Sequence, residues 1–254
     1  RGIEGIEKSF DHYLRGSPGQ KKLLIESGNV AFDETVLRTP EPGQDVQLTV
    51  DAGIQSIVYR EALAAKTSYG AKSVSIVLLD ARTGDILSIV NVPAADPSDR
   101  KSLNLDEVRN RAITDQYEPG STLKPFAIAT ALQEGIITAG SVIQTAPGFI
   151  EVDGKKLQDE RSFGKLTIKE VLAKSSNVGT VKVALKIPSN AMYHYLSLLG
   201  FGKSPDLPLL GMRNGTLPKW KSWEDINQAT ISYGYGVDVT LIQLARAYTV
   251  FTQN

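Results

Sequence analysis

The chain has 254 residues, of which 41% are hydrophobic and 22% charged, enough for one good-sized globular domain and a smaller one. Its 28 basic and 28 acidic residues cancel, so nothing indicates a nucleic-acid partner and we expect none. The absence of cysteine excludes disulfides, zinc–thiolate sites and thiol nucleophiles. No apolar run approaches the ~20 residues that span a bilayer, and the sequence starts at Arg1 without a methionine or signal segment.

Periodicity and turn residues predict the elements in chain order. Up to about residue 47 the chain is polar and rich in turn-forming residues. The stretch 51–66 has apolar residues at helical spacing, and Asp51 is placed to cap its start. Two β-branched runs at 73–79 and 86–92 flank a polar turn, which predicts a β-hairpin. In the rest of the chain we expect helices over 121–134, 167–174, 178–186, 189–199 and 240–251.

A serine followed three residues later by a lysine stands at the start of the first of these later helices. Pro119 breaks the structure before it, and Pro125 is tolerated only in a first helical turn. Residues three apart lie on one face of a helix, so we expect the Lys124 amine within reach of the Ser121 hydroxyl. This pair predicts a serine nucleophile with an amine base.

The spacing alone is weak evidence, because Ser-x-x-Lys occurs three times in this chain. Ser98 precedes Lys101 in a polar loop and Ser162 precedes Lys165 in an expected turn, whereas only Ser121 opens an apolar helix. The alternative is that Ser121 caps this helix while the lysine stem covers apolar surface.

A second polar element follows the capping box of Thr167 and Glu170, roughly fifty residues after the first. The helix that starts there ends near Ser175, and another begins after Asn177, so we expect both side chains to point into a cleft. The alternative is that these residues, with Ser176 between them, only cap the two helix ends. The presence of both elements on packed helices favours chemistry.

With these elements, the chain resembles the penicillin-binding proteins, whose signature includes serine-x-x-lysine. Within that family it resembles the class B, division-specific peptidoglycan D,D-transpeptidases of Gram-negative bacteria, of the penicillin-binding protein 3 type. The likeness covers nearly the whole chain in the family's order. Its main segments are RGIEGIE at 1–7, LTVD at 48–51, VLLD and TGDIL within 77–87, YEPGSTLKP at 117–125, SSNVG at 175–179 and YGYG at 233–236.

The resemblance implies an α+β transpeptidase fold, with helices packed on an antiparallel sheet. It implies a non-catalytic pedestal remnant over 1–48 and the amino-terminal portion of a transpeptidase domain over 49–254. The family's third motif, Lys-Thr-Gly or Lys-Ser-Gly on a strand, is not in this sequence, and the Arg-Thr-Gly at 82–84 lies in the hairpin turn. We therefore expect an incomplete sheet, a source protein that extends past Asn254, and a fragment that alone is unstable and inactive.

The resemblance also implies an activity and its residues. Such an enzyme cross-links peptidoglycan stem peptides ending in D-Ala-D-Ala during septal synthesis through a serine acyl-enzyme, and β-lactam antibiotics acylate and inhibit it. Carried onto this sequence, Ser121 is the nucleophile and Lys124 its base. Ser175 carries a proton to the leaving amine, and Asn177 holds a substrate amide. We expect further substrate contacts from Thr122, Ser176, Tyr233 and Gly234.

Burial at the positive end of a helix should lower the pKa of Lys124 toward neutrality, so that a neutral amine can take the Ser121 proton. The Ser121 amide can supply one donor to the developing oxyanion. In the family, the second donor comes from the strand that is missing here.

The family's setting implies partners and a location. We expect an anchor before Arg1 in the bacterial inner membrane, the catalytic part on the periplasmic face, and contacts with a membrane-embedded glycosyltransferase and division proteins. We expect no cofactor and no metal, because His12 and His194 have no second ligand at a suitable spacing. A serine β-lactamase or β-lactam-sensing domain, and a non-enzymatic binding scaffold, are the alternatives. The pedestal-like start and the region around Thr240 argue against the first, and the intact serine and lysine against the second.

Overall fold

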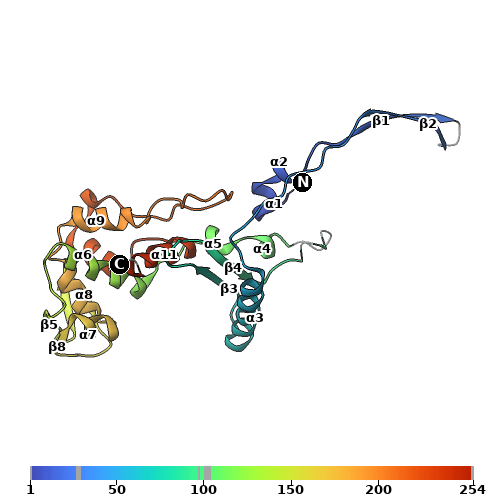
Figure 1. Cartoon of the computed structure of the whole chain (residues 1–254). Helices are drawn as coiled ribbons and strands as arrows, with labels where there is room; N and C mark the ends of the chain where they lie inside the picture. Colours follow the sequence, from blue (N-terminus) through green and yellow to red (C-terminus); the bar gives the residue numbers. More distant parts are fainter. Residues whose placement is uncertain (1, 27–29, 97, 100–103, 253–254) are drawn as a thin grey trace.

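The computed structural model describes residues 2–26, 30–96, 98–99 and 104–252. Its amino-terminal part holds the short helices α1 (Gly5–Ser9) and α2 (Asp11–Leu14), then an antiparallel hairpin of β1 (Gln20–Glu26) and β2 (Val30–Arg38). Figure 1 shows this hairpin projecting away from the rest of the molecule. We described this part as rich in turns and predicted no strand in it, because the run QKKLLIE places charged and apolar residues in blocks and lacks the alternation that predicts a strand.

The next elements confirm the predicted helix and hairpin. Helix α3 (Ala52–Tyr69) begins at Asp51, whose carboxylate accepts a hydrogen bond from the Ile54 amide at 2.8 Å. Strands β3 (Val74–Leu79) and β4 (Ile86–Val92) pair in antiparallel register. One face of this hairpin packs against α3 through a buried cluster of Ala62, Val90 and Val92. Over the part of the chain that is described, β3 and β4 pair only with each other.

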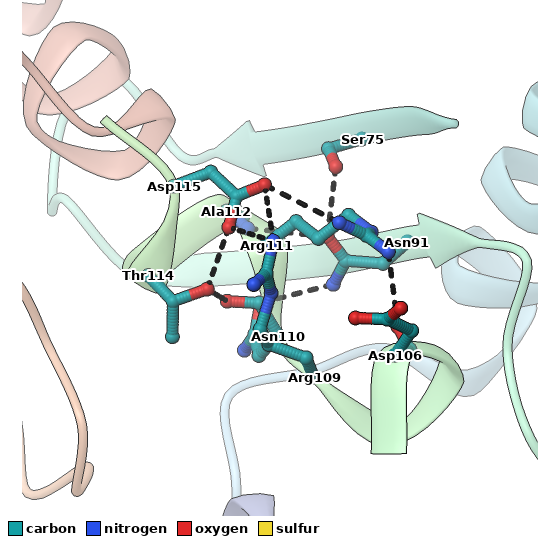
Figure 2. A network of polar contacts seen from close by, with 9 residues as sticks. All are labelled: Ser75, Asn91, Asp106, Arg109, Asn110, Arg111, Ala112, Thr114 and Asp115. Atoms are coloured by element: carbon teal, nitrogen blue, oxygen red, sulfur yellow. Dashed lines mark hydrogen bonds and ion pairs between the residues drawn. The ribbon is translucent and has the colours of Figure 1, made fainter. Parts of the chain in front are cut away.

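A polar network joins the β3–β4 hairpin to the short helices that follow it, α4 (Leu105–Val108) and α5 (Arg111–Thr114) (Figure 2). The side-chain oxygen of Asn91 accepts hydrogen bonds from the Ser75 hydroxyl at 2.8 Å and the Ala112 amide at 3.1 Å. Its side-chain amide donates to Asn110 at 2.9 Å. The sheet thus holds the start of α5, the helix from which the chain runs toward Ser121.

The helical body contains the helices predicted after residue 120 and one more. They are α6 (Lys124–Gln133), which follows the 3₁₀ turn η1 (Gly120–Leu123), α7 (Ile168–Ala173), α8 (Asn177–Ala184), α9 (Ser189–Leu198), α10 (Asp225–Ser232) and α11 (Leu241–Tyr248), with short 3₁₀ turns η2 (Trp220–Ser222) and η3 (Thr249–Thr252). The capping box predicted at the start of α7 is formed, and α11 also starts with a capping box, made by Thr240 and Gln243. Helix α10 was not predicted, because its cap is Glu224, which is an unusual residue for a helix start.

The core of this body surrounds α6. Phe126 and Ala131 of α6 are buried in one cluster with Val183 of α8, Leu196 of α9 and Leu244 of α11. Helix α6 is therefore covered by apolar side chains from several sides, and the nucleophile turn at its amino-terminal end rests on a rigid support.

Two small antiparallel pairs lie between α6 and α7. They are β5 (Val142–Gln144) with β8 (Lys165–Thr167), and β6 (Phe149–Val152) with β7 (Lys155–Gln158). We predicted no strands here, because segments of three or four residues are too short to show alternation. The Asp153-Gly154 pair could have predicted the β6–β7 hairpin, because Asp-Gly favours a tight hairpin turn. Both residues have the positive φ that such a turn requires, 48° and 73°.

The segment between α9 and α10 extends back along the molecule (Figure 1). The Leu210 amide donates to the Ser9 hydroxyl at 3.0 Å, which ties this segment to α1. None of the helices in the described ranges combines the length and apolar character needed to cross a membrane. The helices and antiparallel pairs together confirm the expected α+β fold class.

Candidate active site

Ser121 lies in the turn η1, which runs directly into α6 with Pro125 in its first turn. The side chains of Leu123 and Phe126 are buried beneath this turn, whereas Ser121 itself is exposed. Its hydroxyl makes no hydrogen bond to any described residue. The buried side chains thus support the turn from below, and the turn presents the Ser121 hydroxyl to solvent.

Lys124 is only 2% exposed, which is exceptional for a lysine. Its amine donates hydrogen bonds to the Ser175 hydroxyl, at 2.9 Å, and to the Ser175 carbonyl oxygen. We expected this amine within reach of the Ser121 hydroxyl. Within the described part of the chain it bonds instead to Ser175, from the other polar element that the sequence singled out.

The conformation of Ser175 explains this contact. Ser175 follows the end of α7 with φ = +53°, in the left-handed region that non-glycine residues rarely adopt. Its amide bonds to the Leu172 carbonyl and the Ser176 amide to the Val171 carbonyl, which closes the helix end. This backbone turn brings the Ser175 hydroxyl and carbonyl to Lys124. Strain of this kind, about 1–3 kcal/mol, persists where the surrounding structure enforces it, often at functional sites.

Burial sets the protonation of Lys124. Loss of solvent around the ammonium group lowers the pKa of Lys124 to about 8, while the negative charge of Asp159 acts in the opposite direction and raises it by less. The pKa of Lys124 is thus lowered, as we expected from the position of this residue. About one amine in ten is then neutral at pH 7 and able to accept a proton.

Asp159 is a buried carboxylate that sequence reasoning missed. It accepts hydrogen bonds from the Ser176 hydroxyl at 2.7 Å and from the Val178 amide at 3.0 Å, at the start of α8. A carboxylate is favoured at that end of a helix. No local pattern marks Asp159 in the sequence, because its partners lie on a helix that begins after another strand and helix have intervened.

Ser176, which we expected to contact the substrate, is the residue that caps α8. It is fully buried, and its oxygen also accepts a hydrogen bond from the Gly179 amide at 2.9 Å, as the cap of α8. Its environment matches the capping alternative. Asn177 is half-exposed, and its side-chain amide donates to the Gln158 carbonyl of β7 at 3.0 Å.

The loop after α10 lies against the nucleophile turn. The Gly120 amide donates to the Gly234 carbonyl at 3.1 Å, and a Cβ at Gly234 would lie 2.1 Å from the Gly120 oxygen. The half-buried Tyr233 stands beside it, with its pKa raised by burial and by the neighbouring Tyr235. The hydroxyl of Thr122, another expected substrate contact, donates to the Pro119 carbonyl at 2.6 Å.

The structure thus gathers most of the predicted residues in one place. Ser121, Thr122 and Lys124 lie on one turn, Ser175 contacts it through the lysine, and Gly234 contacts it through the backbone. Among the described residues, no three His, Cys, Asp or Glu side chains are grouped so that they could hold a metal ion. The arrangement can supply an exposed nucleophile, a partly neutral amine and a hydroxyl bonded to that amine.

Known proteins share this arrangement of sequence and fold. The family model described as the penicillin binding protein transpeptidase domain matches residues 74–254. The chain is 40% identical over 248 residues to peptidoglycan D,D-transpeptidase FtsI of Escherichia coli K12, covering 98% of this chain and 42% of that protein. It is 39% identical over 257 residues to a probable peptidoglycan D,D-transpeptidase PenA of Neisseria flavescens, covering 100% of this chain and 64% of that protein.

Solved structures of penicillin-binding proteins and related enzymes are also similar to this chain. The transpeptidase domain of penicillin-binding protein 3 from Burkholderia pseudomallei superposes with a TM-score of 0.73 at 38% identity, covering 82% of this chain and 59% of that one. A structure described as a peptidoglycan glycosyltransferase from Burkholderia ambifaria gives a TM-score of 0.74 at 39% identity, with 80% and 60% covered. The chain therefore spans roughly two fifths to two thirds of the lengths of these relatives. On the match to residues 74–254 and on these identities, it belongs to the penicillin-binding protein transpeptidase family.

Proposed function

We propose that this chain carries the nucleophile and base of a peptidoglycan D,D-transpeptidase that cross-links stem peptides during septal cell-wall synthesis. The observation that carries the proposal is the buried Lys124 amine, with its pKa lowered to about 8, bonded to Ser175 and placed three residues after the exposed Ser121. Burial disfavours the charged form of a lysine and so lowers its pKa. Lysines with such a shifted pKa occur most often at functional sites, where the neutral amine can act as a base.

In the proposed reaction, neutral Lys124 takes the Ser121 proton, and the serine oxygen attacks the carbonyl carbon of the penultimate D-alanine of a stem peptide. The Ser121 amide donates to the oxyanion that develops. The proton passes from Lys124 through the Ser175 hydroxyl, 2.9 Å away, to the amine of the leaving D-alanine. An amine of a neighbouring stem peptide then attacks the acyl-enzyme and restores Ser121.

The other site residues hold the substrate in this proposal. Asn177 bonds a substrate amide, for which its side chain would exchange its present contact with the Gln158 carbonyl. Thr122, Tyr233 and Gly234 contact the substrate on the side next to Ser121. β-Lactams acylate Ser121 as stem-peptide mimics and leave slowly.

We extend the proposal to the whole protein on the strength of its resemblance to the division-specific transpeptidases. Residues 1–48 belong to a non-catalytic pedestal and 49–254 to the transpeptidase domain. The enzyme works at the periplasmic face of the bacterial inner membrane, together with a membrane-embedded glycosyltransferase and other division proteins.

Mass spectrometry of the complete protein tests the nucleophile. Treatment with benzylpenicillin should add one drug mass to the wild type and to Ser162→Ala, which removes the serine of another Ser-x-x-Lys copy. Ser121→Ala should remain unlabelled. Equal labelling of Ser121→Ala would contradict the assignment, and rapid turnover of a chromogenic cephalosporin would favour a β-lactamase instead.

A further inference from the structure

The side chain of Glu118, three residues before Ser121, reaches across to the loop after α10. Its carboxylate accepts a hydrogen bond from the Gly236 amide at 2.8 Å, and the two residues are 118 positions apart in the sequence. A carboxylate that accepts from a backbone amide forms one of the stronger hydrogen bonds in proteins. The contact therefore joins the segment that precedes the nucleophile to an exposed loop.

Backbone hydrogen bonds flank this contact on both sides. Tyr117 and Val239 exchange two hydrogen bonds of 3.0 Å, and the Gly120 amide donates to the Gly234 carbonyl at 3.1 Å. The two segments thus run side by side from Tyr117 to Gly120. Glu118 supplies the side-chain link in the middle of this contact.

Two glycines form the tip of the loop after α10. Gly234 and Gly236 have φ of +87° and +78°, and glycines leave a backbone many alternative conformations. The amides of Gly234 and Tyr235 bond to carbonyls at the end of α10, whereas the Gly236 amide bonds to Glu118. Tyr235 is 49% exposed and packs its ring 5.5 Å from that of Tyr233. The Glu118 contact thus lies next to this aromatic pair and links its loop to the segment before Ser121.

We propose that Glu118 is a positioning residue that holds the 233–236 loop in a fixed position relative to Ser121. This rests on the proposed acyl-transfer function of Ser121. The Ser121 hydroxyl has no hydrogen bond of its own to a described residue, so the backbone around it and the wall facing it set the approach of a substrate. Small misplacements of reacting groups cost up to roughly 100-fold in rate.

Acylation kinetics of the complete protein with benzylpenicillin separate positioning from binding. Glu118→Ala should lower the acylation rate constant on the order of 10- to 100-fold, with a much smaller change in the preceding dissociation constant. Glu118→Gln keeps an oxygen acceptor and should stay within about threefold of wild type. The control is Glu151→Ala, an exposed glutamate of β6 without a side-chain hydrogen bond to a described residue, which should behave as wild type.

Hydrogen exchange tests the link without relying on chemistry. In Glu118→Ala the Gly236 amide should exchange faster, and the 117–123 segment with it. Glu118→Gln should show a smaller increase, because it keeps a neutral acceptor, and Glu151→Ala should match wild type. Wild-type acylation by Glu118→Ala, or a Glu118→Gln variant as slow as Glu118→Ala, would overturn the proposal. So would a parallel fall in melting temperature and affinity, since that marks a merely structural role. If wild type is not acylated at Ser121, the proposed function fails, and unchanged exchange in Glu118→Ala would separately refute the link.

Discussion

The Lys124 amine donates a hydrogen bond of 2.9 Å to the Ser175 hydroxyl, although the two residues are 51 positions apart. The contact depends on two conditions. Lys124 is buried at the start of α6, and Ser175 takes a left-handed conformation at the end of α7. Together they give a short path for a proton between an amine and a hydroxyl.

Acylation of Ser121 should rise with pH and level off above about 8, because burial lowers the pKa of Lys124 to about 8 and only the neutral amine acts as a base. Lys124→Arg keeps the charge but cannot deprotonate in this range, and should lose orders of magnitude at every pH. Acylation rates measured from about pH 6 to 10 check this, with the exposed Lys169→Arg as control. A flat profile in wild type, or an active Lys124→Arg, would refute the base role.

Lys124→Met should stabilise the protein at pH 7 by about 1–3 kcal/mol, since it removes a buried charge. The folded pKa of Lys124, about 8, lies below the usual lysine value of 10.5, so the folded state binds fewer protons than the unfolded state between these values. The stability of wild type should therefore rise through this pH window, and the advantage of the methionine variant should shrink. Denaturant unfolding at pH 7 and pH 10 measures the difference, and an unchanged gap would contradict the prediction.

Asp159→Asn should move the midpoint of the acylation pH profile to lower pH, because the Asp159 charge raises the pKa of Lys124. It should also cost on the order of 1 kcal/mol of stability, as its hydrogen bonds to Ser176 and Val178 lose their charge assistance. Asp206→Asn, at an exposed position, should change neither quantity. A midpoint that stays in place or rises would show that Asp159 does not influence the base.

Gly234→Ala should destabilise the fold by several kcal/mol and abolish acylation, since the new Cβ would lie 2.1 Å from the Gly120 oxygen. Gly135→Ala is a matched control, because Gly135 also has positive φ, +68°, but no atom within 4 Å of the added carbon. That variant should pay only the conformational cost of about 1–2 kcal/mol. Equal melting temperatures for the two variants would mean that the contact with Gly120 yields easily.

Gln243→Leu should lower stability by about 2–4 kcal/mol. The side-chain amide of Gln243 is buried and donates to the carbonyls of Gly200, Lys203 and Asn214, at 3.2, 2.7 and 2.8 Å. Its loss would leave those carbonyls without this donor and free the segment between α9 and η2. Limited proteolysis should then cut within 200–216 faster, whereas the exposed Gln133→Leu should leave the cutting rate unchanged.

Strong local patterns were predictable. The caps at Asp51, Thr167 and Thr240 depend on residues three positions apart, and the β3–β4 hairpin depends on two long β-branched runs around a polar turn. All the residues that make up such a pattern lie in one short segment of the chain. The β1–β2 hairpin, the strands between α6 and α7, and α10 were missed because each is too short, or too irregular in its polar pattern, to stand out from a loop.

Neighbouring residues were enough to predict that Ser121 opens a buried helix and that Ser175 and Asn177 stand at a helix junction, because helix starts and ends follow from local patterns. Three contacts could not be predicted in this way: the Lys124 amine bonds to Ser175, the Asp159 carboxylate bonds to Ser176, and Glu118 reaches Gly236. These are contacts between separate segments. Their distances depend on how the helices pack, and packing is set by the whole core rather than by any local run of residues.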